Sequence, residues 1–377
     1  MSSPILPPAT IGIFGGGQLG RMTALAARSL GYSIQVLDPS PDCAARPVVD
    51  RVIVAPFDDP DGAAELARGC DVLTIEIEQI APEALAAAGE HAPVRPGPDV
   101  LRIVQHRGRQ KRWLTSHGFP VGPHAIVSTA AELATAAREI GPSLFVKACQ
   151  GGYDGRSQIR HAAGAAANES FDRLGGRESV AEQALELSLE LSVLVARRRV
   201  GDVVVYPPAV NHHERQVLAW SVLPGELAPD VVERAQAIAR DIAEALDLEG
   251  IVVVEMFLLR DGQLLVNELA PRPHNSYHAS EVACPTSQFE QLVRAVCDLP
   301  LGVSSPTRPA AIVNLFGDLW TDGRQPDFSA ALAVPGSRVV LYGKHGARPG
   351  RKMGHLVAGG DTPSEALRRV QDAARRL

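Results

Sequence analysis

The sequence predicts an α/β protein whose N-terminal part contains a doubly wound parallel sheet. In that part, short apolar segments alternate with helix-like segments, which is typical of repeated strand and helix units. Later in the chain, an apolar hairpin carries two glutamates, Glu255 and Glu268. The composition agrees with folded domains, because 45% of the 377 residues are hydrophobic and 21% are charged.

Each expected element follows from a local pattern. The strands are short apolar runs, and the helices place their apolar residues on one face. A proline-rich segment at residues 91–98 predicts a boundary. Strands are expected at residues 10–14, 33–37, 51–54, 72–75, 143–148, 180–182, 187–197, 203–207, 216–222, 252–259 and 264–269. Helices are expected at residues 18–30, 61–68, 100–117, 162–174, 228–246 and 363–377.

Charge and cysteine usage exclude several classes of protein. The net charge of -6 argues against a general affinity for nucleic acid or an anionic membrane, so any phosphate binding is expected to be local. The five cysteines form no C-x-x-C pair, which favours reduced thiols over a disulfide framework or a zinc site. The N-terminus lacks a targeting pattern, and no apolar run reaches the roughly 18 residues that a membrane span needs. A cytoplasmic protein is therefore expected.

A glycine-rich turn after the first strand fits two interpretations. Gly15, Gly17 and Gly20 match G-x-G-x-x-G, and Asp38 ends the next strand, as in dinucleotide-binding enzymes. The glycines, however, specify only a backbone that can approach some phosphate at a helix N-terminus. A dinucleotide-dependent oxidoreductase is the weaker alternative, because nothing downstream has the pattern of a hydride-transfer site.

The hairpin of Glu255 and Glu268 predicts a metal site. A strong turn signal, Asp261-Gly262, separates its two apolar strands, so the carboxylates can lie side by side. They repel each other unless a cation lies between them, and Mg²⁺ held by carboxylates and substrate phosphates is the usual solution. Solvated strand glutamates are the alternative. A group of polar residues beside the second strand disfavours it: Asn267, Arg272, His274, Asn275 and Ser276.

A lysine and a glycine-rich loop precede this hairpin and indicate nucleotide binding. Lys147 closes an apolar strand, and the loop of residues 150–156 follows at once. A lysine in that place can hold nucleotide phosphates as a point charge, and Glu182 and Glu190 on later strands can bind adenine and ribose. An ordinary hairpin with a surface lysine is the alternative for the first two features alone. The whole series, in this chain order, resembles the ATP-grasp fold.

Motifs over almost the whole chain resemble one family within that fold. They are GGGQLGRM at 15–22, TIEIE at 74–78, GGYDGRSQ at 151–158, NELAPRPHNS at 267–276 and YGKHGARPGRKMGH at 342–355. Together they are similar to the N5-carboxyaminoimidazole ribonucleotide synthetases, the ATP-grasp ligases of purine biosynthesis. The resemblance implies that ATP, bicarbonate and 5-aminoimidazole ribonucleotide react through carboxyphosphate to give ADP, phosphate and the N5-carboxylated ribonucleotide.

The resemblance also implies a role for each matched residue. ATP binding is expected at Arg107, Lys147, Gly152, Tyr153, Asp154, Gly155, Arg156, Glu182, Glu190, His213, Asn267 and Glu268. Ribonucleotide binding is expected at Gly17, Gln18, Leu19, Glu76, Tyr153, Arg156, Arg272, Lys344 and Arg351. The metal ion, Mg²⁺ or Mn²⁺, is expected at Glu255 and Glu268. The catalytic residues are expected to be Asp154 as general base, with Arg272, His274 and Asn275 at carboxyphosphate.

Some of these roles have local alternatives. His212 competes with its neighbour His213 for the nucleotide, and a solvated basic turn is the alternative for Lys344 and Arg351. Another ATP-grasp ribonucleotide enzyme, such as the formate-dependent glycinamide ribonucleotide transformylase, is an alternative for the whole chain. A noncatalytic nucleotide sensor is another.

The family pattern further implies a homodimer and three domains. These are an N-terminal pre-ATP-grasp domain at 1–104, an ATP-grasp domain at 105–299 and a small C-terminal domain at 300–377. Two residues depart from the pattern, since Ser157 and Tyr277 stand where glycine is expected. We expect Ser157 to stiffen the glycine loop and Tyr277 to place an aromatic ring near the bicarbonate site.

Overall fold

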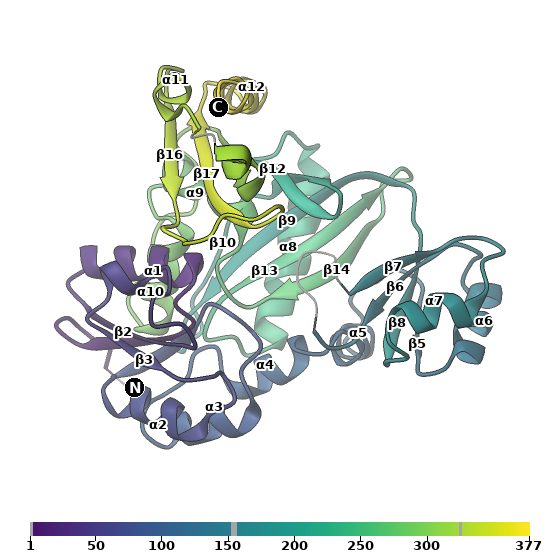
Figure 1. The fold of residues 1–377 in the computed structure, drawn as a ribbon, viewed down its shortest axis with the longest axis horizontal. Coiled ribbons are helices and arrows are strands. Elements are labelled where there is room, and N and C mark those ends of the chain that lie inside the picture. Colours follow the sequence, from purple (N-terminus) through teal and green to yellow (C-terminus); the bar gives the residue numbers. More distant parts are fainter. Residues whose placement is uncertain (1–2, 152–156, 324–325) are drawn as a thin grey trace.

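The computed structural model describes residues 3–151, 157–323 and 326–377, and it confirms the predicted α/β class (Figure 1). Within these residues the strands form a parallel four-stranded sheet, a small antiparallel four-stranded sheet and a nine-stranded central sheet. The N-terminal sheet and the small sheet lie toward opposite ends of the molecule, with the central sheet between them (Figure 1).

The N-terminal sheet is doubly wound, as predicted. Its strand order is β3-β2-β1-β4, and every pair is parallel. One face packs Ile11 and Ile13 with apolar residues of the first helix, and the other face packs Phe14 and Leu73 with the second and third helices. Both faces are therefore buried, which explains why these strands are almost continuously apolar. The elements are β1 (Thr10–Phe14), α1 (Gln18–Ser29), β2 (Ser33–Asp38), β3 (Arg51–Val54), α2 (Pro60–Arg68), β4 (Val72–Ile75) and α3 (Pro82–Gly89).

The small sheet has the order β5-β8-β6-β7 and carries two helices over one core. Val127, Leu144 and Val146 of its strands pack with Leu133 and Phe171 of the helices. This unit forms the right-hand end of the molecule in Figure 1. Its elements are β5 (His124–Val127), α6 (Ala130–Glu139), β6 (Leu144–Ala148), β7 (Gln158–His161), α7 (Ala167–Arg173) and β8 (Ser179–Gln183).

The central sheet runs from the predicted metal hairpin to the C-terminal strands. Its order is β14-β13-β9-β11-β12-β15-β17-β16, with β10 paired to β9. Because β12 pairs with β15, the C-terminal strands continue the same sheet as the hairpin. The strands are β9 (Leu187–Arg197), β10 (Val203–Val205), β11 (Ala209–Glu214), β12 (Val217–Leu223), β13 (Gly250–Leu259), β14 (Leu264–Ala270), β15 (Ala310–Phe316), β16 (Ser337–Leu341) and β17 (Lys352–Gly359).

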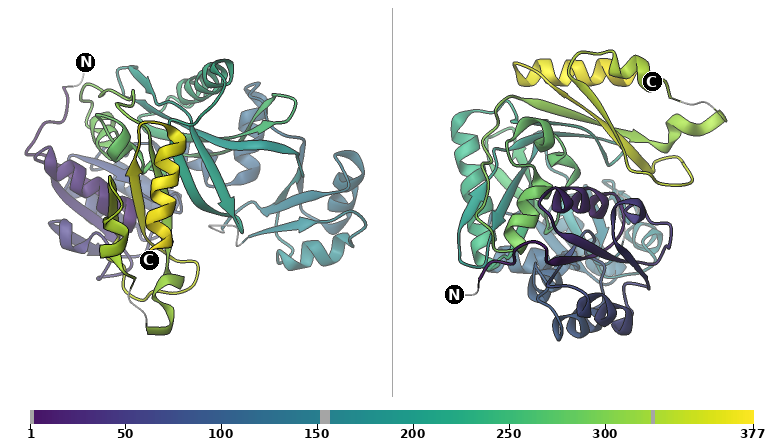
Figure 2. Two further views of the ribbon diagram at one scale, coloured as in Figure 1. Left: turned by 90° about the horizontal axis from the view of Figure 1, so that it is seen from above. Right: turned by 90° about the vertical axis from the view of Figure 1, so that its left-hand side faces the viewer.

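Helices cover this sheet and join it to the N-terminal sheet. The amphipathic α8 packs on β9 and β13, α10 lies between them and α1, and α12 lies along β15 and β17 (Figure 2). The segment expected as one helix at 100–117 is two helices, since α4 ends before α5 begins at Arg107. The helices are α4 (Pro98–Val104), α5 (Arg107–Ser116), α8 (Pro229–Ala245), α9 (Ser280–Ala283), α10 (Gln288–Val296), α11 (Phe328–Leu332) and α12 (Pro363–Arg375). No described helix is long and apolar enough to cross a bilayer.

Tyr277 corrects one expectation from the sequence. Its ring is fully buried in the core shared by α1, α10 and the central sheet, and it is not among the residues that line the central cavity. Its hydroxyl lies 2.9 Å from the carbonyl oxygen of Ser192 and 2.8 Å from that of Pro207. The expectation that this ring lies near the bicarbonate site was wrong, because hydrogen bonds to these two carbonyls hold the side chain in the core.

Replacing this hydroxyl should reduce stability without changing the chemistry. Tyr277→Phe removes the donor to two buried carbonyls, so we expect the free energy of unfolding to fall by about 1–2 kcal/mol. Urea denaturation measures this loss, and turnover under native conditions serves as the control. Reduced turnover with unchanged stability would place the ring at the reacting groups after all.

Candidate active site

A cavity of about 900 Å³ brings together residues of the small and central sheets with residues that follow β1 and β4 of the N-terminal sheet. Every predicted site residue that the structure describes lines it. From the N-terminal part these are Gly17, Gln18, Leu19, Glu76 and Arg107; from the middle, Lys147, Glu182, Glu190, His213, Glu255, Asn267, Glu268, Arg272, His274 and Asn275; from the C-terminal part, Lys344 and Arg351. The predicted residues Gly152, Tyr153, Asp154, Gly155 and Arg156 lie outside the described residues.

The two hairpin glutamates face each other, as the turn signal predicted. Glu255 on β13 lies directly opposite Glu268 on β14, and a bulge follows at once, since Met256 pairs with Val266. Asn267 is therefore the extra residue of β14. In a regular strand, consecutive side chains point to opposite faces, but the bulge allows both Asn267 and Glu268 to line the cavity.

Electrostatics separates these two carboxylates. Burial raises the pKa of Glu268 above its usual value, and the charge of Glu255 raises it further. Burial also acts to raise the pKa of Glu255, but the hydrogen bond and charge of His274 outweigh it and lower the pKa. His274 Nε2 lies 3.0 Å from Glu255 Oε1, and Asn267 Nδ2 lies 3.4 Å from Glu255 Oε2. In the protein without ligands, His274 therefore compensates the negative charge of Glu255 directly.

Two lysines converge on Glu182, and the sequence interpretation identified only one of them. Lys147 Nζ lies 2.5 Å from one oxygen of Glu182, and Lys111 Nζ lies 2.7 Å from the other. Lys111 belongs to α5, one helical turn after Arg107, and both residues line the cavity. The i, i+4 spacing of Arg107 and Lys111 was the sequence signal that could have identified Lys111, because such residues share one helix face.

The structure distinguishes the two adjacent histidines of β11. His213 lines the cavity, and its Nδ1 lies 2.8 Å from Glu190 Oε2. Burial acts to lower the pKa of His213, but Glu190 outweighs it and raises the pKa. His212 instead stacks on Trp220, with ring centroids 4.9 Å apart. Of the two, His213 is the residue that a ligand in the cavity can reach.

The glycine turn before α1 is occupied by a side chain of this protein. The amides of Gly17 and Gly20 donate to the two oxygens of Glu76, at 2.5 and 2.6 Å. A Cβ atom at Gly17 would lie only 2.3 Å from Glu76 Oε1, which explains the need for glycine there. Since a carboxylate holds the helix N-terminus where a dinucleotide fold binds pyrophosphate, the oxidoreductase alternative loses its main support.

A chain of polar contacts joins this turn to the C-terminal segment. The side-chain amide of Gln18 accepts a hydrogen bond from Lys344 Nζ through its Oε1 and donates through its Nε2 to Asn275 Oδ1 at 3.4 Å. Arg351 donates to the carbonyl oxygens of His345 and Gly346, which shapes the basic turn. Residues of three distant sequence segments therefore meet on one side of the cavity.

Arg272, which follows β14 and could bind an anion, is held in place by an ion pair. Arg272 Nε lies 2.7 Å from Glu78 Oε1, and both side chains are buried. Glu78 belongs to the TIEIE motif but was not predicted as a site residue, although it also lines the cavity. Local sequence patterns could not show that Glu78 lies next to Arg272, because the two residues belong to different expected domains and are far apart in the sequence.

The backbone of Ser157, the other departure from the family pattern, contacts the end of β6. Its carbonyl oxygen accepts a hydrogen bond from Ala148 N at 2.9 Å. Whether it stiffens the loop stays a prediction.

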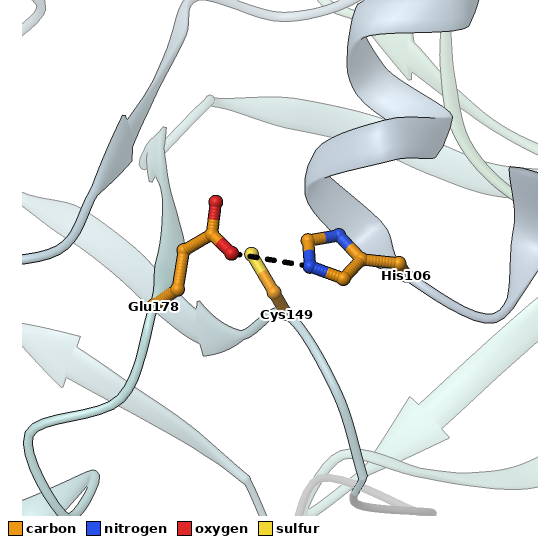
Figure 3. A group of neighbouring side chains, drawn as sticks. All are labelled: His106, Cys149 and Glu178. Atoms are coloured by element: carbon orange, nitrogen blue, oxygen red, sulfur yellow. Dashed lines mark hydrogen bonds and ion pairs between the residues drawn. The ribbon is translucent and has the colours of Figure 1, made fainter.

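His106, Cys149 and Glu178 form a second polar group next to the cavity (Figure 3). His106 Nδ1 accepts from Arg109 N at the start of α5, so its Nε2 carries the proton and donates to Glu178 at 3.1 Å. Burial raises the pKa of the Cys149 thiol to about 11. Metal ligation would require a deprotonated thiol and a free Nε2. In the present geometry His106 is the N-cap of α5, and Glu178 accepts its other ring N–H.

Comparisons with known proteins agree with this arrangement. Three family models match consecutive parts of the chain: the ribonucleotide synthetase preATP-grasp domain at residues 8–105, the ATP-grasp domain at 112–289, and the phosphoribosylaminoimidazole carboxylase C-terminal domain at 310–369. The N5-carboxyaminoimidazole ribonucleotide synthase of Bacillus subtilis is 39% identical over 354 residues, which are 94% of this chain and 92% of that protein. The enzyme of the same name from Brucella melitensis is 40% identical over 93% of this chain and 96% of its own length.

Solved structures show the same relationship. The crystal structure of an N5-carboxyaminoimidazole ribonucleotide synthetase in complex with ADP has a TM-score of 0.92 and 37% identity, and covers 99% of this chain and 98% of its own. The synthase from Aspergillus clavatus, in complex with ADP and 5-aminoimidazole ribonucleotide, has a TM-score of 0.90 and 30% identity, and covers 97% and 98%. The chain therefore belongs to the N5-carboxyaminoimidazole ribonucleotide synthase family of ATP-grasp ligases.

Proposed function

We propose that this protein uses ATP and bicarbonate to carboxylate 5-aminoimidazole ribonucleotide at its exocyclic nitrogen, releasing ADP and phosphate. The observation that carries this proposal is the single cavity, which joins the Lys147 and Glu182 cluster, the Glu255 and Glu268 pair, and the basic C-terminal turn. Such a cavity has separate places for a nucleoside triphosphate, a metal and a second anionic substrate. The names of the similar enzymes point to the same reaction.

The residues of the hairpin fit a hard divalent cation. Glu255 and Glu268 supply carboxylate oxygens from directly opposed positions, which is the ligand type that Mg²⁺ or Mn²⁺ prefers. The raised pKa of Glu268 reflects burial and the like charge of Glu255, which a cation there would offset. When bound, the metal would neutralise charge on the transferring phosphoryl group.

We assign the first step to bicarbonate and ATP. A bicarbonate oxygen attacks the γ-phosphorus, the bond to the β-phosphate oxygen breaks, and ADP leaves as carboxyphosphate forms. Arg107 and Lys147 are assigned to the phosphates, and Glu182, Glu190, His213 and Asn267 to the rest of the nucleotide pocket. Arg272, fixed by Glu78, supplies positive charge beside the cavity, as developing negative charge on carboxyphosphate requires. His274 and Asn275 are assigned to the same group.

The second step transfers the carboxyl group to the amine. The exocyclic nitrogen attacks the carbon of carboxyphosphate or of the carbon dioxide that it releases, phosphate leaves, and the nitrogen loses a proton. We assign that proton to Asp154, and the ring and ribose to Tyr153, Arg156 and Glu76. The ribonucleotide phosphate is assigned to the Gly17 to Leu19 turn with Lys344 and Arg351, whose side chains line the cavity. The three domains at 1–104, 105–299 and 300–377, the homodimer and the cytoplasmic location stay predictions.

Substrate dependence of ADP release tests the proposed function directly. In the presence of Mg²⁺, ADP release should rise strongly when 5-aminoimidazole ribonucleotide and bicarbonate are added together, because both are needed for productive turnover. Glycinamide ribonucleotide with formate is the matched control. Equal or faster turnover on that pair would favour the transformylase, and binding of nucleotide without any turnover would favour a sensor.

The metal assignment predicts a large effect of one neutral substitution. Glu268→Gln keeps the side-chain shape but removes a ligand charge, so we expect ATP turnover to fall at least about a hundredfold, on the scale of losing one electrostatic transition-state contact. Circular dichroism should remain unchanged. Near wild-type turnover at saturating Mg²⁺ would mean that the two carboxylates do not act on a metal.

The basic turn predicts a loss confined to the ribonucleotide. Arg351→Ala removes a charge-assisted contact worth roughly 1.5 to 3 kcal/mol, which is about one to two decades in affinity. Calorimetric titration should show this loss for 5-aminoimidazole ribonucleotide and nearly unchanged ATP binding. Arg351→Lys should recover only part of the affinity, because an ammonium lacks the bidentate fork. An equal loss for both nucleotides would assign the turn to the ATP pocket.

A further inference from the structure

Glu182 is bound by two ammonium groups of different character. Lys147 reaches one carboxylate oxygen from β6, and Lys111 reaches the other from α5. The side chains of all three residues are 14% exposed or less. One carboxylate therefore meets two buried cations, which is one positive charge more than a simple ion pair requires.

The other contacts of the two lysines differ in kind. Lys111 Nζ also donates to the backbone carbonyl oxygens of Asn267 and Val266, at 2.9 and 3.5 Å. Lys147 Nζ has its second contact with a side chain, Asn267 Oδ1, at 3.3 Å. Lys111 is thus fixed to the backbone of β14. Within the described part of the chain, Lys147 contacts the side chains of Glu182 and Asn267, so it can change partner at smaller cost.

Nucleotide binding separates these roles, and this step rests on the proposed function. Lys147 is assigned to the nucleotide phosphates, so it must exchange part of its contact with Glu182 for a phosphate oxygen. We propose that Lys111 is the positioning residue that keeps Glu182 charged and in place when Lys147 moves to the phosphates. Glu182 can then continue to bind the adenosine part of the nucleotide.

The electrostatics of the group agrees with this division. Burial acts to raise the pKa of Glu182, but the two lysines outweigh it and lower the pKa to about 2. Burial lowers the pKa of Lys111, and Glu182 acts in the opposite direction. A buried carboxylate without a nearby cation is costly. Glu182 therefore needs a cationic partner that stays in place when Lys147 moves to the phosphates.

Two ligands distinguish positioning from a general structural role. ADP carries phosphates that attract Lys147, whereas adenosine carries none and leaves Lys147 on Glu182. Without Lys111, Glu182 still has Lys147 to itself when adenosine binds, but it must share Lys147 with the phosphates when ADP binds. The affinity for ADP should therefore depend on Lys111 far more than the affinity for adenosine.

The experiment measures both affinities for Lys111→Met in the full-length protein. We expect the Kd for ADP to rise about ten- to a hundredfold, the range for losing a hydrogen bond to a charged group. The Kd for adenosine, measured by competition with a fluorescent ADP analogue, should change less than about threefold, since Lys147 still pairs with Glu182 in that complex. Lys111→Gln keeps an N–H donor for the β14 carbonyls but removes the charge, so it should repeat the pattern and replaces the first variant if that one does not fold.

Arg112→Met is the matched control. It removes a cation from the next position of α5, where the exposed Arg112 contacts Glu178 at 3.5 Å, and it should leave both affinities unchanged. Equal losses for ADP and adenosine, or no loss for ADP, would overturn the proposal. Failure of the wild-type protein to bind ADP would instead contradict the proposed function, so the two failures can be told apart.

Discussion

The repulsion between Glu255 and Glu268 is the constraint on which the rest of the site depends. Two carboxylates in directly opposed, partly buried strand positions cannot both remain anions without nearby positive charge. The protein supplies it asymmetrically, since His274 contacts Glu255, while the charges of Arg107 and Lys147 act on Glu268. The cations that compensate the pair in the free protein are thus the ones assigned to phosphate and carboxyphosphate. A ligand that competes for them changes the charge balance at the carboxylates, so the proposed metal site would respond to substrate binding.

The continuous central sheet explains how distant segments reach this pair. β14, which carries Glu268, lies at one end of the sheet, and the C-terminal strands lie at the other. The pairing of β12 with β15 carries the chain across, so that the turn before β17 returns Lys344 to Gln18. Gln18 in turn contacts Asn275, which follows β14. The side of the cavity assigned to the ribonucleotide is therefore connected to the hairpin through one sheet. The position of the basic turn between β16 and β17 depends on the register of these strands.

Local patterns predicted much of this architecture, because strands that are buried on both faces and hairpins with an aspartate-glycine turn leave strong signals. The N-terminal strands and β9 agree with the expected bounds, and the two hairpin glutamates pair as expected. β11 was missed because most of its residues are polar and hide the apolar alternation, and of these polar residues His213 lines the cavity. Lys111 could have been identified from its helical spacing to Arg107. Glu78 and the core position of Tyr277 depend on contacts between distant segments, which periodicity cannot reveal. The roles assigned to residues 152–156 rest on the family motif alone.

The glycine turn shows why a motif fixes backbone shape and leaves function open. Gly15 adopts a φ of 102°, and Gly17 allows the close approach of another group, so any compact anion could bind at the start of α1. The anion that does so is Glu76, which stands at the end of β4, a neighbouring parallel strand. Its carboxylate satisfies the amides that pyrophosphate would use, and it fixes the turn so that Gln18 points toward Lys344 and Asn275. The turn has the glycine pattern of dinucleotide-binding enzymes, but here it lines a different kind of site. Glu76, which causes this difference, follows β4, so β2, β3 and β4 separate it from the turn in the sequence.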